Sequence, residues 1–100
     1  MLTKLQPTSP GEMLLTEFLE PMGISQYRLA KDIAVPQTRI SKIIKNERTI
    51  TPDTALRLAC YFNMSAEFWM NLQSGYDLKS ARQLIGKKIA NEVRPLDKVA

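Results

Sequence analysis

The sequence has no histidine and only one cysteine, Cys60, among its 100 residues. An internal disulfide is therefore impossible, and so are a zinc site built from cysteine and histidine and a catalytic triad that uses histidine as its base. A recognisable catalytic pair of carboxylates is also missing. We therefore expect a protein that is not an enzyme, has no catalytic residues, and binds neither a metal nor a cofactor.

The single cysteine follows Leu58 and Ala59 on a predicted helix. A free cysteine in this setting most often serves as a small packing residue, and a redox role is the alternative. We expect the Cys60 thiol to be buried or half-buried.

Long apolar segments are absent as well. No apolar run approaches the roughly 18 residues that a transmembrane helix needs. The first segment, MLTKLQPTSPGE, lacks the apolar stretch and cleavage site of a signal peptide. Hydrophobic residues make up 44% of the chain and the mean hydropathy is −0.21. We expect one globular domain in the cytoplasm, with no membrane contact and no small-molecule substrate.

Basic residues outnumber acidic ones by 14 to 10, which gives a net charge of +4. One basic stretch lies between Gln26 and Arg48, where only Asp32 and Glu47 are acidic; its cations are Arg28, Lys31, Arg39, Lys42, Lys45 and Arg48. A second basic stretch runs from Lys79 to Lys98. Clustered positive charge of this kind favours binding to the phosphates of a nucleic acid.

Start and stop signals predict an all-α fold of five helices, because apolar residues recur at helical spacing and no strand pattern competes. The first helix follows Ser9 and Pro10, and Pro21 is expected to end or kink it near Glu20. Gly23 then supplies a stop. The remaining helices are expected at about 25–33, 36–45, 52–62 and 65 to 86–90, the last with a bend allowed at Gly75.

These helices define the expected organisation of the chain. Residues 1–8 form a flexible N-terminal segment, residues 9–90 form the domain, and residues 91–100 form a frayed tail. Residues 25–45 make a pair of short helices joined by a turn at Ala34 and Val35.

The second helix of this pair has two chemically different sides. Pro36, Ile40, Ile43 and Ile44 fall on one apolar side, and the other side carries Gln37, Thr38, Arg39, Ser41, Lys42 and Lys45. Such a helix suits the major groove of DNA, because its donors can meet base edges while its apolar side packs down. We predict base contacts from Gln37, Thr38, Arg39, Ser41 and Lys42. An ordinary solvated helix face is the alternative.

Phosphate contacts are predicted at both ends of the helix pair. Gln26 and Arg28 lie at the start of the first helix, where backbone N–H groups and the helix dipole attract an anion. Lys45, Asn46 and Arg48 lie just past the second helix. Contacts of this kind raise affinity and salt dependence without sequence preference. A role in solubility alone is the alternative for each of them.

The segment LAKDIAVPQTRISKII resembles the helix-turn-helix of the phage-repressor or Xre class. It has Ala30 at the fifth position of the motif and apolar residues later, at Ile40 and Ile43. The class often has glycine at the turn, where this chain has Ala34. An alanine with a positive φ there costs about 1 kcal/mol.

Three longer segments resemble a narrower family, the HigA (VapI-like) antitoxins. They are SPGEMLLTEFLEPMGIS, RISKIIKNERTITPDTALRLACYF and SAEFWMNLQSGYDLKSAR, and together they cover about residues 9–82. The EFWMNLQ…YDL signature at 67–78 is the most specific part. The resemblance implies a five-helix lambda-repressor-like DNA-binding domain with a long C-terminal helix. It also implies base contacts at Gln37, Thr38 and Lys42, with Arg39 and Ser41 nearby, and phosphate contacts at Gln26, Arg28, Lys45 and Asn46.

The same resemblance implies three partners. They are double-stranded operator DNA, a second copy of the chain, and a RelE-like mRNA endonuclease toxin that the protein neutralises while repressing its own operon. The dimerisation element is the helix at 65–90, and we expect its interface to include Trp69, Leu72, Tyr76 and Leu78. Helical spacing of the aromatic residues favours the core or a subunit contact over a platform for single-stranded nucleic acid.

Two other functions remain open at this point. One is a stand-alone Xre or phage-type transcriptional repressor without a toxin partner. The other is a protein-interaction adaptor that uses the helical domain without DNA.

Overall fold

The structure is a computed structural model that describes residues 8–97. These residues form five helical segments and no strand, which confirms the predicted all-α fold class. The first segment consists of α1 (Pro10–Met13), the π-helical η1 (Leu14–Leu19) and α2 (Glu20–Met22). The others are α3 (Gln26–Asp32), α4 (Gln37–Ile44), α5 (Pro52–Phe62) and α6 (Ala66–Glu92). Most of the predicted segment 1–8 and the end of the predicted tail, 98–100, lie outside the described residues.

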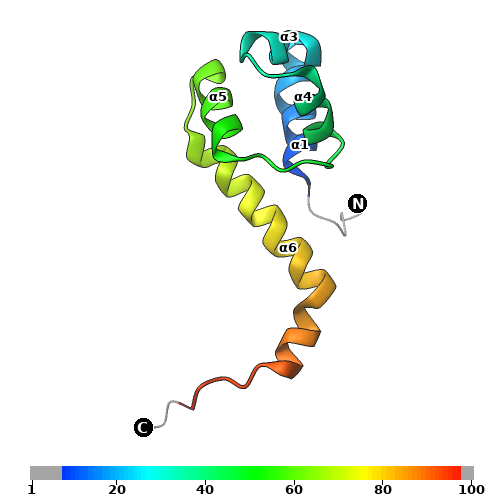
Figure 1. Cartoon of the computed structure of the whole chain (residues 1–100), viewed down its shortest axis with the longest axis vertical. Helices are drawn as coiled ribbons and strands as arrows, with labels where there is room; N and C mark the ends of the chain where they lie inside the picture. The colour runs from blue at the N-terminus through cyan, green and yellow to red at the C-terminus, as the bar shows by residue number, and fades with distance from the viewer. Residues whose placement is uncertain (1–7, 98–100) are drawn as a thin grey trace.

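The described helices form a head and a stalk. The elements from α1 to α5 pack together with the start of α6, and the rest of α6 extends away from them (Figure 1). Helix α6 has 27 residues, or about 40 Å at 1.5 Å per residue. It passes through Gly75 without interruption and ends slightly beyond the predicted range.

Serine side chains start three of the helical segments. The hydroxyl oxygen of Ser9 accepts the N–H of Glu12 at 3.1 Å, that of Ser25 accepts Arg28 at 3.0 Å, and that of Ser65 accepts Phe68 at 3.2 Å. Each bond satisfies a backbone donor that has no partner inside the helix.

The prediction that Pro21 ends or kinks the first helical segment near Glu20 is wrong in its first part, because the helix does not end there; instead its geometry changes just before the proline. The helix continues through Pro21 to Met22 and ends at Gly23, whose φ is +66°. Proline lacks an N–H group and clashes with the carbonyl four residues earlier in α geometry. The preceding turns are π-helical, and the N–H of Glu20 already bonds to the carbonyl of Leu15. This wider spacing accommodates the proline ring.

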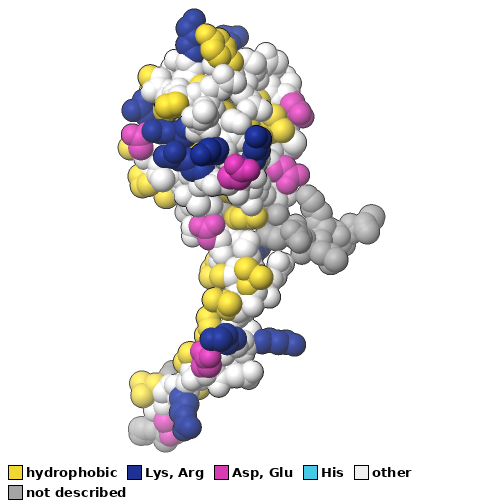
Figure 2. All heavy atoms as spheres, turned by 45° about the vertical axis from the view of Figure 1, so that its right-hand side comes forward, with side chains coloured by type: hydrophobic (Ala, Val, Ile, Leu, Met, Phe, Trp, Pro, Cys, Tyr) yellow, Lys and Arg dark blue, Asp and Glu magenta, His cyan; other side chains and the backbone are white. Residues whose placement is uncertain are grey.

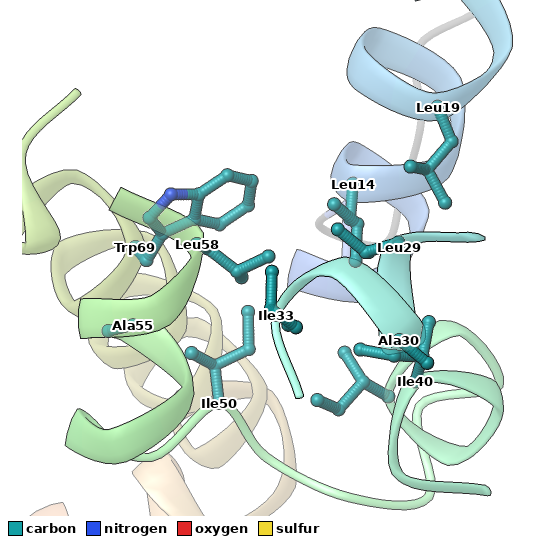
Figure 3. Packing of buried hydrophobic residues seen from close by; sticks show 11 residues of the cluster. Leu14, Leu19, Leu29, Ala30, Ile33, Ile40, Ile50, Ala55, Leu58 and Trp69 are labelled. Atoms are coloured by element: carbon teal, nitrogen blue, oxygen red, sulfur yellow. The ribbon is translucent and has the colours of Figure 1, made fainter. Parts of the chain in front are cut away.

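The core is one apolar cluster to which every helical segment contributes. Figure 3 shows its members, which are Leu14, Leu19, Leu29, Ala30, Ile33, Ile40, Ile43, Ile50, Ala55, Leu58 and Trp69. Ile50 comes from the polar loop between α4 and α5 and anchors that loop in the core. Trp69 carries the start of α6 into the same core, with its ring centroid 5.0 Å from that of Phe18.

Cys60 is exposed, so the expectation of a buried or half-buried thiol is wrong. Ala55 and Leu58 mark the core side of α5. Cys60 follows Leu58 by two residues, and this step turns the side chain about 200° around the helix axis. The thiol therefore faces outward.

Gly11 lets α1 touch the backbone of α4. A Cβ atom at Gly11 would overlap the Ile43 carbonyl group and the Cα of Ile44. The contact is between two backbones, so no side-chain rotation can relieve it. Gly11 thus sets how closely α4 approaches the first helical segment.

We predict that Gly11→Ala lowers the free energy of unfolding by about 1–3 kcal/mol or more, because the added methyl group forces the two backbones apart. Urea denaturation followed by circular dichroism measures the change. Gly75→Ala is the matched control, since a Cβ there meets no atom within 4 Å. It should stabilise the protein by up to about 1 kcal/mol because Gly75 is inside a helix. Equal stability of Gly11→Ala and wild type would contradict the close contact.

Candidate nucleic-acid interface

Helices α3 and α4 are joined by a turn that contains a left-handed alanine. Ala34 has a φ of +61°, as anticipated for a position that often holds glycine. The N–H of Ala34 donates to the carbonyl of Lys31 at 3.2 Å, and the N–H of Val35 donates to that of Ala30 at 3.0 Å. These bonds close the end of α3 and fix the direction in which α4 begins.

Helix α4 buries one side and exposes the other. Ile40 and Ile43 are fully buried. Four of the polar residues on the opposite side are exposed and Ser41 is half-buried; the exposed ones are Gln37, Thr38, Lys42 and Lys45. Because residues three and four apart are neighbours on a helix, Gln37, Ser41 and Lys45 form one row. Thr38 and Lys42 form a second row beside it.

Arg39 is not part of this exposed face. It precedes Ile43 by one helical turn and therefore lies on the flank of the buried side. Its side chain is 23% exposed, and its Nη1 donates to the carboxylate of Asp53 at 2.9 Å. Base contact by Arg39 stays a prediction, and this ion pair does not support it.

Asp53 connects three helices through two arginines. Its Oδ1 accepts Arg39 of α4 and also the Nε of Arg57 at 2.8 Å, while Nη1 of Arg57 donates to the carbonyl of Ile33 at the end of α3. The hydrogen bond from Arg57, followed by that from Arg39, lowers the pKa of Asp53 below its ordinary value of 3.8. The carboxylate therefore stays ionised at neutral pH and holds both guanidinium groups.

Nothing in the local sequence marks this role of Asp53. Its place in the first turn of α5 suits the helix dipole and accounts for an acidic residue there without any partner on α4. The partner Arg39 is distant in the sequence, and only the arrangement of α4 against α5 brings them together. A carboxylate beside Arg57 at i+4 was the only local signal.

The predicted phosphate-contact residues differ in their surroundings. Lys45 and Arg48 are exposed at the end of α4, and Gln26 is half-buried. Arg28 is exposed and forms an ion pair with Asp32 at 3.4 Å. Asn46 is exposed, but its amide nitrogen donates to the hydroxyl oxygen of Tyr76 on α6 at 2.7 Å. Figure 2 shows lysine and arginine side chains gathered on one face of the head.

A second tyrosine links α5 to α3. The hydroxyl of Tyr61 donates to the Asp32 carboxylate at 2.8 Å. This hydrogen bond raises the pKa of Tyr61 above its ordinary value, because only the neutral hydroxyl can donate. Asp32 thus accepts bonds from both Arg28 and Tyr61 and fixes the end of α3 against α5.

Three of the four predicted dimer-interface residues face the head. Trp69 is completely buried in the core of its own chain, so it offers no surface to a second copy and is removed from the predicted interface. Leu72 is half-buried against the core, and Tyr76 bonds to Asn46. Leu78, which is 52% exposed, lies on the open part of the stalk.

The stalk carries an exposed apolar stripe. Leu78, Ile85 and Ile89 are 52%, 44% and 46% exposed. Their spacing of seven and four residues puts them on one side of α6, and counting 100° per residue puts Trp69 and Gln73 on the opposite side. Figure 2 shows hydrophobic side chains exposed along the stalk. Among residues 8–97, no helix is both long and apolar enough to cross a membrane.

Comparison with known proteins assigns this architecture to a family. The helix-turn-helix family profile matches residues 15–69, more than half of the chain. Virulence-associated protein I of Dichelobacter nodosus is 48% identical over 87 residues, which cover 87% of this chain and 79% of that protein. Antitoxin HigA-1 of Vibrio cholerae is 40% identical over 94 residues, which cover 94% and 88%. The chain belongs to the HigA (VapI-like) family of helix-turn-helix antitoxins.

A solved structure extends the likeness to three dimensions. Pseudomonas aeruginosa antitoxin HigA with the higBA promoter matches the chain with a TM-score of 0.89 at 43% sequence identity. The match covers 92% of this chain and 100% of that one. The family resemblance found in the sequence is thereby confirmed. Since this family comprises DNA-binding regulators, the chain is not an enzyme.

Proposed function

We propose that this protein binds operator DNA as a homodimer, represses its own operon, and neutralises a RelE-like mRNA endonuclease toxin in the cytoplasm. The observation that carries the DNA-binding part is the exposed polar face of α4, which is held outward by the burial of Ile40 and Ile43. The related HigA structure with its promoter supports the same part.

The exposed face of α4 supplies the chemistry for direct readout in the major groove. The amide of Gln37 can pair with adenine, the ammonium of Lys42 can reach guanine, and the methyl group of Thr38 can contact thymine. Ser41 lies in the same row as Gln37 and adds a hydroxyl donor and acceptor. Arg39 orients α4 through Asp53.

The cations around this face position the helix on the duplex. Lys45 and Arg48 follow α4 and would contact the phosphate backbone, with Gln26 and Arg28 at the start of α3 on the other side of the turn. Asn46 would contact the phosphates through its backbone and its amide oxygen, since its amide nitrogen donates to Tyr76. These contacts raise affinity and fix the register without specifying sequence.

A two-fold dimer places two copies of α4 on one operator. We propose that the copies associate through the apolar stripe of Leu78, Ile85 and Ile89, which its own chain leaves uncovered. The symmetry of such a dimer requires a palindromic operator, with half-sites one helical turn or a multiple of it apart.

The toxin partner is supported by the relative named Antitoxin HigA-1. Co-expression of this chain with a basic RelE-like protein from the neighbouring gene, followed by affinity purification, tests the antitoxin role. We expect a stable complex and rescue of cell growth. If the toxin arrested growth to the same extent with this chain as without it, the result would instead favour a repressor without a toxin.

We predict that Gln37→Ala and Lys42→Ala each weaken operator binding by about 1–3 kcal/mol, because each removes a base contact. Fluorescence anisotropy with a labelled operator measures the dissociation constants. Lys87→Ala is the matched control, since it removes one exposed positive charge from the stalk. The proposed reading face would be rejected if both α4 variants bound like wild type.

We predict that Ile85→Glu converts the dimer into a monomer, because a carboxylate cannot be buried in an apolar interface without a partner. Analytical ultracentrifugation gives the molecular mass. Lys87→Glu is the control, because this residue is exposed and lies two positions further along the helix, on nearly the opposite side. Dimers of unchanged stability in Ile85→Glu would exclude the stripe as the interface.

A further inference from the structure

The loop between α4 and α5 is bonded to α6 at two points. Near its start, the amide nitrogen of Asn46 donates to the Tyr76 hydroxyl oxygen at 2.7 Å. Near its end, the N–H of Ile50 donates to the side-chain carbonyl of Gln73 at 2.8 Å. Gln73 is only 6% exposed, and its amide nitrogen donates in turn to Asp77 at 2.9 Å. Both bonds therefore join the loop that follows α4 to the base of the stalk.

The first of these bonds acts almost directly on α4. The N–H of Asn46 bonds to the carbonyl of Ile43 at 3.0 Å, and the N–H of the next residue, Glu47, bonds to that of Lys42 at 2.8 Å. Asn46 itself has a φ of +63° and closes the helix. Because Asn46 is fixed to the last turn of α4, its bond to Tyr76 fixes the end of α4 relative to α6.

The second bond fixes the other end of the loop. The side chain of Ile50 is buried in the core, and its N–H would lack a partner without Gln73. A buried backbone donor without a partner costs about 1–3 kcal/mol. The pairing therefore fixes the position of the loop along the axis of α6. Because Tyr76 follows Gln73 by less than one helical turn, the two bonds hold the loop to the same part of α6.

We infer that Tyr76, Asn46 and Gln73 are positioning residues that set the angle between α4 and the stalk, and through it the half-site spacing that the dimer accepts. This inference rests on the proposed operator binding by a dimer joined through α6. The stalk acts as a lever. A tilt of about 10° at its base displaces a point about 20 Å along it by about 3.5 Å, roughly the rise of one base-pair step.

A geometric role and a merely structural role have different consequences. Loss of a bond that only stabilises the loop lowers the folded fraction and weakens binding to every operator by the same factor. Loss of a bond that sets the angle changes the relative affinity for operators whose half-sites differ in separation. The informative quantity is thus a ratio of affinities, in which uniform effects cancel.

The test compares Tyr76→Phe and Asn46→Gly with wild type on three DNA duplexes. The duplexes share identical half-sites and have the natural spacer, one base pair fewer, or one base pair more. Tyr76→Phe keeps the ring and removes only the hydroxyl, and glycine at position 46 accepts the positive φ. Fluorescence anisotropy gives the ratio of affinities for the natural and altered spacers.

We expect each variant to lower this ratio by roughly threefold or more, the effect of losing one ordering hydrogen bond. The double variant should lower it no further, because both changes break the same bond. Tyr61→Phe is the matched control: it removes a tyrosine hydrogen bond of 2.8 Å to Asp32 in the same head without touching α6, and should keep the wild-type ratio.

An unchanged ratio in Tyr76→Phe would overturn the inference, as would an equal loss in Tyr61→Phe. If the wild-type protein bound none of the three duplexes, the proposed operator binding would itself fail, together with the inference built on it. These results are distinguishable, because the first two leave wild-type binding intact.

Discussion

The burial of Ile40 and Ile43 decides what α4 presents to its surroundings. These two side chains lie in the common core, and the backbone of Ile43 meets that of Gly11 without an intervening side chain. A helix held this closely cannot rotate about its own axis without losing apolar contacts or colliding with α1. The polar face is therefore oriented by packing on the opposite side. The affinity of such a surface for DNA depends on this rigidity as well as on its charges.

The positive charges of the head serve different purposes, which composition alone does not distinguish. Arg39 and Arg57 are both bonded to Asp53 and hold α3, α4 and α5 together. Lys42 on α4 and Lys45 directly after it are exposed and have no such role in the packing. An arginine suits the first task, because its planar guanidinium group can bond in several directions at once. A lysine suits the second, because it carries a compact charge on a flexible side chain.

Local features of the structure could be predicted from the sequence with good accuracy. The capping bonds of Ser9, Ser25 and Ser65, and the positive φ of Asn63 at the end of α5, depend on only a few neighbouring residues. Helical periodicity likewise gave the amphipathic character of α4. These features have signals that lie within about one helical turn.

The remaining features depend on partners distant in the sequence. No local pattern pairs Asn46 with Tyr76 or Ile50 with Gln73. The sequence therefore predicts a phosphate contact for Asn46 and a dimer contact for Tyr76, and it marks no role for Gln73. The sequence predicts a subunit contact for Trp69, which is buried in the core, because periodicity gives the face of a helix but not what covers that face. What covers each face of α6 is decided by how α6 packs against the other helices of the head.

The outward position of Cys60 gives the molecule a useful chemical property. It is the only thiol in the sequence, and it is exposed on α5, where it borders the end of α3 at Asp32 and Ile33. A maleimide dye or spin label can thus be attached at one defined place on the unaltered chain. Two such labels in one assembly would report the separation of the heads, while air oxidation of the same thiol would join molecules head to head unless a reductant is present.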